Sequence, residues 1–191
     1  MIIGANILSR RVDPTDSSTI PIFADGAAAA ILVPARKSGI LSVHLGADGS
    51  KYDAIRIPAG GTREPLSVEG LRAGRHYMKM EKGAVLFRTA SRTMAEAGRE
   101  ALRQAKVRAK EIDWWIPHQA NLRLIRETGA MLDIPAERTV TVVDRYGNSS
   151  AASIPIALAH AVDAGKVRRN DLLLLAAVGA GMTNAAVVLR W

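Results

Sequence analysis

The chain has 191 residues, a length that fits one large domain and excludes a long repeat array. Hydrophobic residues make up 48% and charged residues 23%, which is typical of a chain that folds around a core and excludes a disordered one. The formal net charge of +8 favours anionic partners without choosing among them. The absence of cysteine excludes disulfides, thiolate metal sites and a cysteine nucleophile supplied by this chain.

Two apolar stretches resemble membrane or export signals only in their hydrophobicity. Residues 1–8 are too few for a membrane span of about 20 residues and lack the features of a signal peptide. Residues 172–178 run directly into a glycine turn, as a buried strand does. Aromatic residues are only 4% and no groove-binding motif is present. We therefore expect a cytoplasmic protein with neither a membrane nor a nucleic-acid partner.

The first half of the sequence is rich in strand signals and then becomes irregular. Apolar and small residues predict four short strands, at 2–8, 20–23, 27–33 and 39–47. The first is expected to be buried, and Asp48-Gly49 is expected to turn the chain after the last. Residues 51–82 mix glycines and prolines with charges, which predicts a long excursion without regular elements.

The second half alternates helices with strands. Apolar residues at helical spacing predict a long amphipathic helix from Gly83 through Ala105, with its charged face in solvent. Three apolar strands are then predicted, each ending in a polar or glycine-rich corner, at 112–117, 140–143 and 172–178. Helices are expected at 122–132 and 151–164, and a final strand at 185–191. This order predicts an α/β fold with at least part of the sheet parallel.

The three corners carry the chemistry that the sequence suggests. In open α/β sheets, ligands bind beyond the carboxyl ends of the strands, so we expect His118, Asn148 and the backbone of residues 179–181 to converge. An imidazole, a carboxamide and free backbone N–H groups can stabilise negative charge on an oxygen. Each also has a plainer interpretation: a structural histidine, a helix cap and turn glycines. No phosphate-binding glycine motif or close metal-ligand spacing is present, so we expect no cofactor and no metal.

Four segments resemble one known family. They read IIGANILSRRVDPTDSSTIPIFADGAAAAIL at residues 2–32, WWIPHQANLRLI at 114–125, DRYGNSSAASIPIAL at 144–158 and LLLLAAVGAGMTNAAVVLRW at 172–191. These segments are similar to those of the β-ketoacyl-acyl-carrier-protein synthase III family, thiolase-fold condensing enzymes that start fatty-acid synthesis. The last three look like the family's histidine motif, asparagine motif and terminal glycine loop, in the same order.

The resemblance implies a duplicated architecture with two βαβαβαββ halves and the active site between them. Residues 1–35 look like the terminal strands of the N-terminal half, and residues 36–191 look like the complete C-terminal half. In the family, a cysteine of the first half takes the acyl group from acyl-CoA. Since that cysteine is absent here, we expect the chain alone to be unable to run the whole reaction.

The resemblance also implies roles for particular residues. His118 and Asn148 match the pair that hydrogen-bonds the malonyl thioester oxygen during decarboxylation. Gly181 matches the loop that shapes the acyl pocket and the acyl oxyanion hole. Arg123 lies in the stretch near the mouth of the pantetheine tunnel, and Arg88 matches a basic position that docks the carrier protein. The implied substrates are acyl-CoA and malonyl-acyl-carrier protein, and the implied assembly is a homodimer or a complex with a complementing N-terminal half.

The terminal loop departs from the family pattern, which usually reads Gly-Gly-Gly-Phe-Thr-Trp-Gly. Met182 replaces the aromatic residue and Asn184 replaces the tryptophan, so we expect an altered starter preference. Three interpretations stay open: part of a longer condensing enzyme, a natural short subunit completed by a cysteine-bearing chain, or a non-catalytic relative that binds an acyl thioester or carrier protein. We also expect a chain lacking its partner strands to aggregate or to require a partner.

Overall fold

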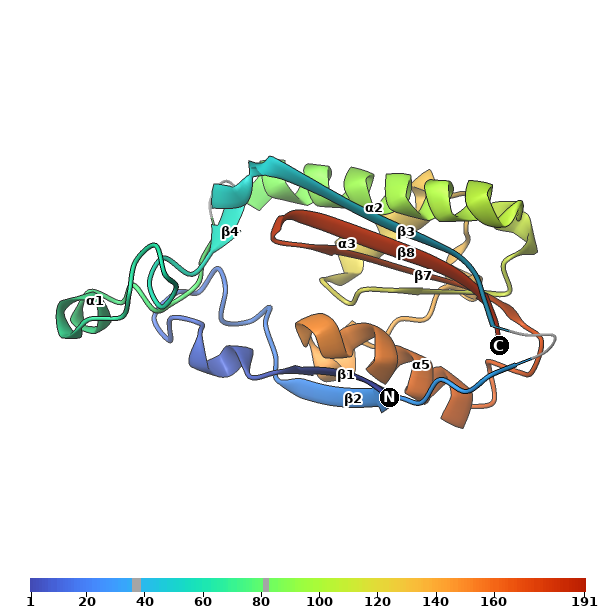
Figure 1. Ribbon diagram of the computed structural model, residues 1–191, viewed down its shortest axis with the longest axis horizontal. Coiled ribbons are helices and arrows are strands. Elements are labelled where there is room, and N and C mark those ends of the chain that lie inside the picture. The colour runs from blue at the N-terminus through green and yellow to red at the C-terminus, as the bar shows by residue number, and fades with distance from the viewer. Residues whose placement is uncertain (36–38, 81–82) are drawn as a thin grey trace.

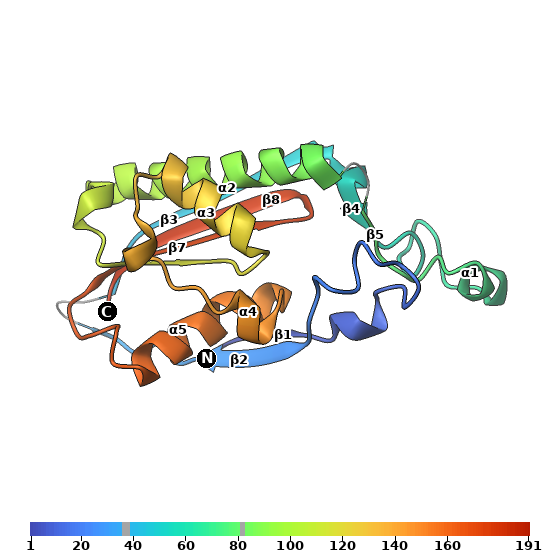
Figure 2. The same ribbon diagram turned by 180° about the vertical axis from the view of Figure 1, so that it is seen from behind.

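A computed structural model describes residues 1–35, 39–80 and 83–191 and shows a layered α/β arrangement (Figure 1). Two helices cover one face of a four-stranded sheet, a third helix covers the other face, and a two-stranded sheet lies beyond that helix (Figures 1 and 2). The strands are β1 Ile2–Asn6, β2 Gly26–Ala30, β3 Gly39–Lys51, β4 Ile55–Arg56, β5 Lys79–Met80, β6 Trp114–Pro117, β7 Leu172–Gly179 and β8 Gly181–Arg190. The helices are α1 Val68–Arg72, α2 Gly83–Ala105, α3 Leu122–Met131, α4 Val143–Tyr146 and α5 Ser153–Asp163.

The four-stranded sheet has the order β3-β8-β7-β6. Strands β6 and β7 run parallel, with Trp114 opposite Leu173, whereas β7 and β8 form an antiparallel hairpin. Strand β3 pairs antiparallel with β8, and Gly46 lies opposite Asn184. The predicted α/β class with a partly parallel sheet is therefore confirmed.

Apolar side chains fill both sides of this sheet. Between the sheet and the helices α2 and α3, Met94, Ile125 and Leu174 are fully buried. Between the sheet and α5, the core contains Ile116 and Leu173. Helix α2 places its apolar stripe in this core, and removing these side chains from water stabilises the packing of the helix on the sheet. The predicted long helix is confirmed.

The two-stranded sheet packs through backbone contact. Strand β1 pairs antiparallel with β2, and a Cβ added at Gly4 would lie 2.4 Å from the carbonyl oxygen of Ala151. The opposite face is open, with Ile3 62% exposed, and Ile2 at the start of the strand is 58% exposed. The prediction that this strand is buried is therefore wrong. Within the described residues no element covers these side chains.

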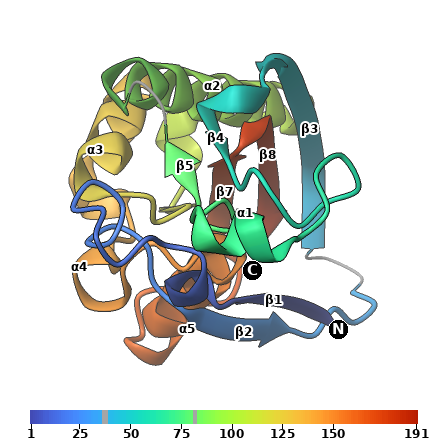
Figure 3. The same cartoon turned by 90° about the vertical axis from the view of Figure 1, so that its left-hand side faces the viewer.

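Three local predictions differ from the structure in whole or in part. Residues 20–23 form turns instead of a strand, because Asp16 accepts the Thr19 hydroxyl at 2.7 Å and the Ile22 N–H donates to the Thr19 carbonyl. Asp48-Gly49 does not turn the chain: β3 continues past it with a shift in register. Residues 51–82 are mostly irregular as predicted, but their described part also contains α1, β4 and β5 (Figure 3).

The strand predicted at residues 140–143 is also wrong. A single bridge joins Thr139 to Trp115, and the Val140 N–H donates to the Trp115 carbonyl at 2.9 Å. Helix α4 then begins at Val143. The expected domain boundary at 35/36 borders residues 36–38, which lie outside the described residues.

Candidate active site

His118 directly follows β6 and faces a cavity. The backbone N–H of His118 donates to the Ala176 carbonyl of β7 at 2.8 Å. This bond extends the parallel pairing of β6 and β7 one residue beyond Pro117. The ring nitrogen Nδ1 lies 2.6 Å from Oγ of Ser153, the first residue of α5. Both backbone and ring are therefore held, and the Nε2 edge of the imidazole is the polar edge left for the cavity.

Burial governs the electrostatics of His118. The imidazole is desolvated, and this lowers the pKa of His118 from 6.5 to about 4. The side chain is therefore neutral at pH 7. A neutral imidazole carries one N–H donor, which suits it to stabilise a developing oxyanion by hydrogen bonding.

Gln119 fixes the corner that presents His118, a role that the sequence analysis missed. Its Nε2 donates to the carbonyls of Pro117 at 2.8 Å and Val140 at 3.1 Å, and its Oε1 accepts from the Val142 N–H at 2.9 Å. The side chain is 1% exposed. It thus occupies the backbone groups with which residues 140–143 would otherwise form a strand. No local sequence pattern distinguishes a glutamine with this role from an exposed one.

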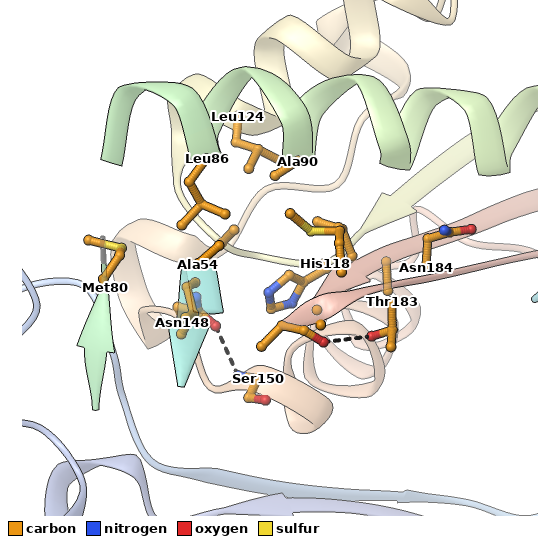
Figure 4. Close-up of a pocket in the computed structure, with 18 of the residues that line it drawn as sticks. Ala54, Met80, Leu86, Ala90, His118, Leu124, Asn148, Ser150, Thr183 and Asn184 are labelled. Atoms are coloured by element: carbon orange, nitrogen blue, oxygen red, sulfur yellow. Dashed lines mark hydrogen bonds between the residues drawn. The ribbon is translucent and has the colours of Figure 1, made fainter. Parts of the chain in front are cut away.

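Asn148 is held by residues from the start of the chain. The backbone N–H of Asn148 donates to the Ile22 carbonyl at 3.0 Å, and its backbone carbonyl accepts from the Ala24 N–H at 2.9 Å. The side-chain Oδ1 accepts from the Ser150 N–H at 3.0 Å (Figure 4). Because that partner is a donor, the oxygen is assigned to this side of the amide and the Nδ2 group to the other. Asn148 therefore stabilises its loop, and within the described residues no hydrogen bond occupies its two amide hydrogens.

The terminal glycine loop forms the hairpin between β7 and β8. Gly181 has a φ of +127°, a backbone conformation in which a residue with a side chain would be strained. A Cβ added at Gly179 would lie 2.9 Å from Oγ1 of Thr183. Thr183 donates its hydroxyl to the Ala180 carbonyl at 3.3 Å. The backbone therefore requires a glycine at position 181, and the Thr183 side chain leaves little room for a side chain at position 179.

One cavity of about 710 Å³ brings these corners together. His118, Asn148 and residues 179–184 all line it, as do apolar side chains of α2 and α3 (Figure 4). The polar side chains on its wall are His118, Asn121, Asn148, Ser150, Thr183 and Asn184. His118, Asn148 and residues 179–181 thus lie around one cavity, as predicted from the sequence. Met182, which is 3% exposed, also lines the cavity and packs into the core under α2.

The two predicted arginines lie outside the cavity wall. Arg123 is exposed on α3, and its guanidinium lies 4.5 Å from the centroid of the Phe87 ring. Phe87 lines the cavity, so Arg123 is at its rim. Arg88 follows Phe87 on α2 and is exposed. Arg123 is therefore at the rim of the cavity, and neither arginine lines the cavity itself.

Asn184 gives the cavity an unexpected polar side chain on the sheet. It lies opposite Gly46 of β3, and a Cβ at Gly46 would lie 2.7 Å from the Asn184 Oδ1. The glycine therefore makes room for the amide to lie across the neighbouring strand. In the view of Figure 4, Asn148 is on one side of His118, and Thr183 and Asn184 are on the other.

Known sequences and structures identify this arrangement. The profile described as 3-Oxoacyl-[acyl-carrier-protein (ACP)] synthase III matches residues 1–49, and the one described as its C terminal matches residues 102–191. The chain belongs to the 3-oxoacyl-[acyl-carrier-protein] synthase III family. The resemblance found from the motifs is thereby confirmed.

Curated relatives of this family match the whole chain. A 3-oxopimeloyl-[acyl-carrier-protein] synthase of Rhodothermus marinus is 53% identical over 100% of this chain and 55% of its own. A β-ketoacyl-[acyl-carrier-protein] synthase III of Clostridioides difficile is 39% identical over 100% of this chain and 58% of its own. The chain thus spans somewhat more than half the length of the curated relatives it matches.

Solved structures of the family share the fold. The 3-oxoacyl-[acyl-carrier-protein] synthase III of Aquifex aeolicus superposes with a TM-score of 0.85 and 42% identity, over 99% of this chain and 56% of that one. The Thermus thermophilus synthase III gives a TM-score of 0.86 and 39% identity over 99% and 58%. The expected thiolase-like fold is confirmed. Among the helices of the described residues, none is long and apolar enough to cross a membrane.

Proposed function

We propose that this chain supplies the enolate-stabilising part of a decarboxylative condensing enzyme. In the reaction, a starter acyl group from acyl-CoA is held on a cysteine and is joined to a two-carbon unit from malonyl-acyl-carrier protein. The present sequence contains no cysteine, so a cysteine-bearing half must come from elsewhere. The role of this chain is then to bind the malonyl thioester and to stabilise the charge that develops on it.

The proposed roles of His118 and Asn148 follow from the bond changes. Cleavage of the carboxylate C–C bond releases CO₂ and leaves its electron pair on the thioester as an enolate. Nε2–H of His118 and Nδ2–H of Asn148 donate to the enolate oxygen. The enolate carbon then attacks the acyl carbon on the cysteine, and the thiolate leaves. Preset donors in a dry site stabilise the enolate more than the malonyl ground state, and this lowers the barrier. No metal or cofactor is needed for these steps.

One observation supports this proposal above the others. Two neutral donors line one cavity, and the second polar atom of each is already engaged, by Ser153 in one case and by the Ser150 N–H in the other. A module that only binds a thioester or a carrier protein has no need of two donors prepared in this way. The arrangement therefore favours a catalytic role over the non-catalytic alternative.

Anionic partners fit the rim of the cavity. Arg123 is exposed over the Phe87 ring, where the phosphates of coenzyme A could approach, and Arg88 is exposed on α2, where an acidic carrier protein could dock. Gly181 is proposed to shape the acyl pocket together with the cysteine-bearing half. Residues 1–35 are proposed to belong structurally to that half and 36–191 to form the other. We further propose a homodimer of the completed enzyme, acting in the cytoplasm.

A starter that carries a carboxylate is a second candidate substrate. The 53% identical relative is named for a 3-oxopimeloyl product, a seven-carbon chain with a terminal carboxylate. Malonyl contributes two of those carbons after CO₂ is lost, so the matching starter is a five-carbon ω-carboxyacyl thioester. Asn184 on the cavity wall supports this candidate, because a buried carboxylate requires hydrogen-bond donors and its amide can supply them.

The first experiment measures CO₂ release from malonyl-acyl-carrier protein, a half-reaction that requires no cysteine. The protein is expected to release CO₂ above the buffer rate, and His118→Ala and Asn148→Ala are each expected to lower that rate about 100-fold. His160→Ala serves as a matched control, since His160 does not line the cavity. Equal rates for all four proteins, with thermal melts showing that each is folded, would reject the proposal. Condensation is expected only after a cysteine-bearing half is added.

A further inference from the structure

Ser153 contacts His118 from behind the cavity wall. It is 2% exposed and does not line the cavity. Its Oγ lies 2.6 Å from Nδ1 of His118 and accepts a longer hydrogen bond, 3.3 Å, from the Gln119 N–H. The hydroxyl thus joins the first turn of α5 to the corner after β6.

The direction of the short hydrogen bond can be derived from the neighbours. A hydroxyl has one hydrogen to donate, and leaving that hydrogen unpaired in a buried position is unfavourable. The Gln119 N–H is a donor and cannot receive it. In the described part of the chain, Nδ1 of His118 is the acceptor that lies within hydrogen-bond distance of this Oγ. Ser153 therefore donates, Nδ1 accepts, and the single proton of the neutral ring is on Nε2.

We propose that Ser153 is a positioning residue that holds His118 in the Nε2–H tautomer and fixes the plane of its ring. This inference rests on the proposed function, in which the Nε2–H group donates to the enolate oxygen. With the opposite tautomer, Nε2 would present a lone pair to that oxygen and repel it. The serine thus determines whether the histidine stabilises or opposes the developing charge, without touching the substrate.

The neutrality of the ring makes this role necessary. A doubly protonated imidazole would donate from both nitrogens and would need no tautomer selection. Burial keeps His118 neutral at pH 7, so one nitrogen carries the proton and the other does not. The orientation of the Asn148 amide is fixed in a similar way, because the Ser150 N–H donates to its oxygen and leaves its nitrogen as the donor to the cavity.

The test reads the tautomer directly, by ¹⁵N NMR of the histidine ring nitrogens in the purified protein. The wild type is expected to show one tautomer of His118, with Nε2 protonated. Ser153→Ala is expected to give a mixture of both tautomers, whereas Ser153→Thr, which keeps a hydroxyl, is expected to retain the wild-type pattern. Ser91→Ala is the matched control: it also removes a buried serine hydroxyl, but that hydroxyl donates to the Phe87 carbonyl.

Kinetics provide the second readout. In malonyl decarboxylation, Ser153→Ala is expected to lower kcat about 10-fold with little change in KM, because ground-state binding does not depend on the tautomer. Ser91→Ala is expected to leave both constants unchanged. A single Nε2–H tautomer in folded Ser153→Ala would overturn the inference even if the enzyme decarboxylates malonyl. The wild-type tautomer is measured without substrate, so absence of decarboxylation would reject the proposed function and leave the role of Ser153 separately measurable.

Discussion

The side-chain Oδ1 of Asn148 accepts a hydrogen bond from the Ser150 N–H at 3.0 Å, which leaves the amide hydrogens of Asn148 on the opposite side. This division of the carboxamide separates its two roles. The oxygen stabilises the loop that precedes α5, and the nitrogen is the proposed donor to the enolate. A substitution that changes one end of the amide can therefore test one role alone.

Asn148→Asp is the substitution that tests the donor. The aspartate keeps an oxygen for the Ser150 N–H but presents a second oxygen to the enolate, so repulsion replaces a hydrogen bond. We expect CO₂ release to fall about 100- to 1,000-fold. Asn170→Asp makes the same chemical change at a residue outside the cavity and is expected to be neutral. Full activity of Asn148→Asp would remove Asn148 from the proposed mechanism.

The depressed pKa of His118 predicts a specific dependence of stability on pH. The unfolded chain protonates this histidine below 6.5 and the folded chain only below about 4. Between those values the unfolded state binds more protons, so the stability contribution is fully present above pH 6.5 and is lost as the pH falls toward 4. The loss is on the order of 3 kcal/mol. Denaturant midpoints measured from pH 4 to 7.5 should show this slope in the wild type and lose it in His118→Gln.

Much of the fold is readable from the sequence because local pattern and tertiary role coincide there. Helix α2 buries the apolar side chains that recur at helical spacing in its sequence. Strand β7 is an uninterrupted apolar run that ends at a glycine, where the hairpin to β8 begins. His118 and Asn148 could be found because each follows an apolar segment at a corner. The donor role of Ser153 could not, since it depends on a contact between residues 35 positions apart.

The failed predictions also have a physical cause in distant contacts. Residues 140–143 have the composition of a strand, but the Gln119 side chain takes the hydrogen bonds that a strand would make. Ile2 and Ile3 have the hydrophobicity of buried residues, yet nothing in the described residues covers them. The first failure depends on a side chain 21 to 23 positions away in the sequence, and the second on the absence of a covering element in the described part of the chain.

Gln119→Leu should show how much the corner after β6 depends on one side chain. The leucine has a similar size but leaves the Pro117 and Val140 carbonyls and the Val142 N–H without their side-chain partner. We expect a loss of about 3 kcal/mol in the free energy of unfolding, measured by denaturant titration. Gln104→Leu, at an exposed glutamine of α2 whose side-chain amide donates to Glu100, is expected to change stability by less than about 0.5 kcal/mol. Similar losses for both variants would contradict the assigned role.

Gly4→Ala tests the contact between the two-stranded sheet and the Asn148 loop. The added Cβ would lie 2.4 Å from the Ala151 carbonyl oxygen, so β1 must shift away from the residues that precede α5. We expect a loss of about 2 kcal/mol in the free energy of unfolding and a lower rate of CO₂ release. Gly49→Ala is the control, because its Cβ would meet nothing within 4 Å. A Gly4→Ala protein as stable as Gly49→Ala would show that β1 does not pack tightly against Ala151.

Asn184→Leu tests the choice of starter. Leucine is close in size to asparagine and still faces Gly46, but it removes the amide from the cavity wall. If the amide binds a terminal carboxylate, its loss removes a hydrogen bond to a charged group, which is worth roughly 1.5–3 kcal/mol. With a cysteine-bearing half supplied, kcat/KM for glutaryl-CoA is therefore expected to fall at least about 10-fold while that for acetyl-CoA holds. Equal changes for both thioesters would show that Asn184 shapes the cavity without selecting the starter, and a wild-type preference for acetyl-CoA would reject the ω-carboxyacyl candidate.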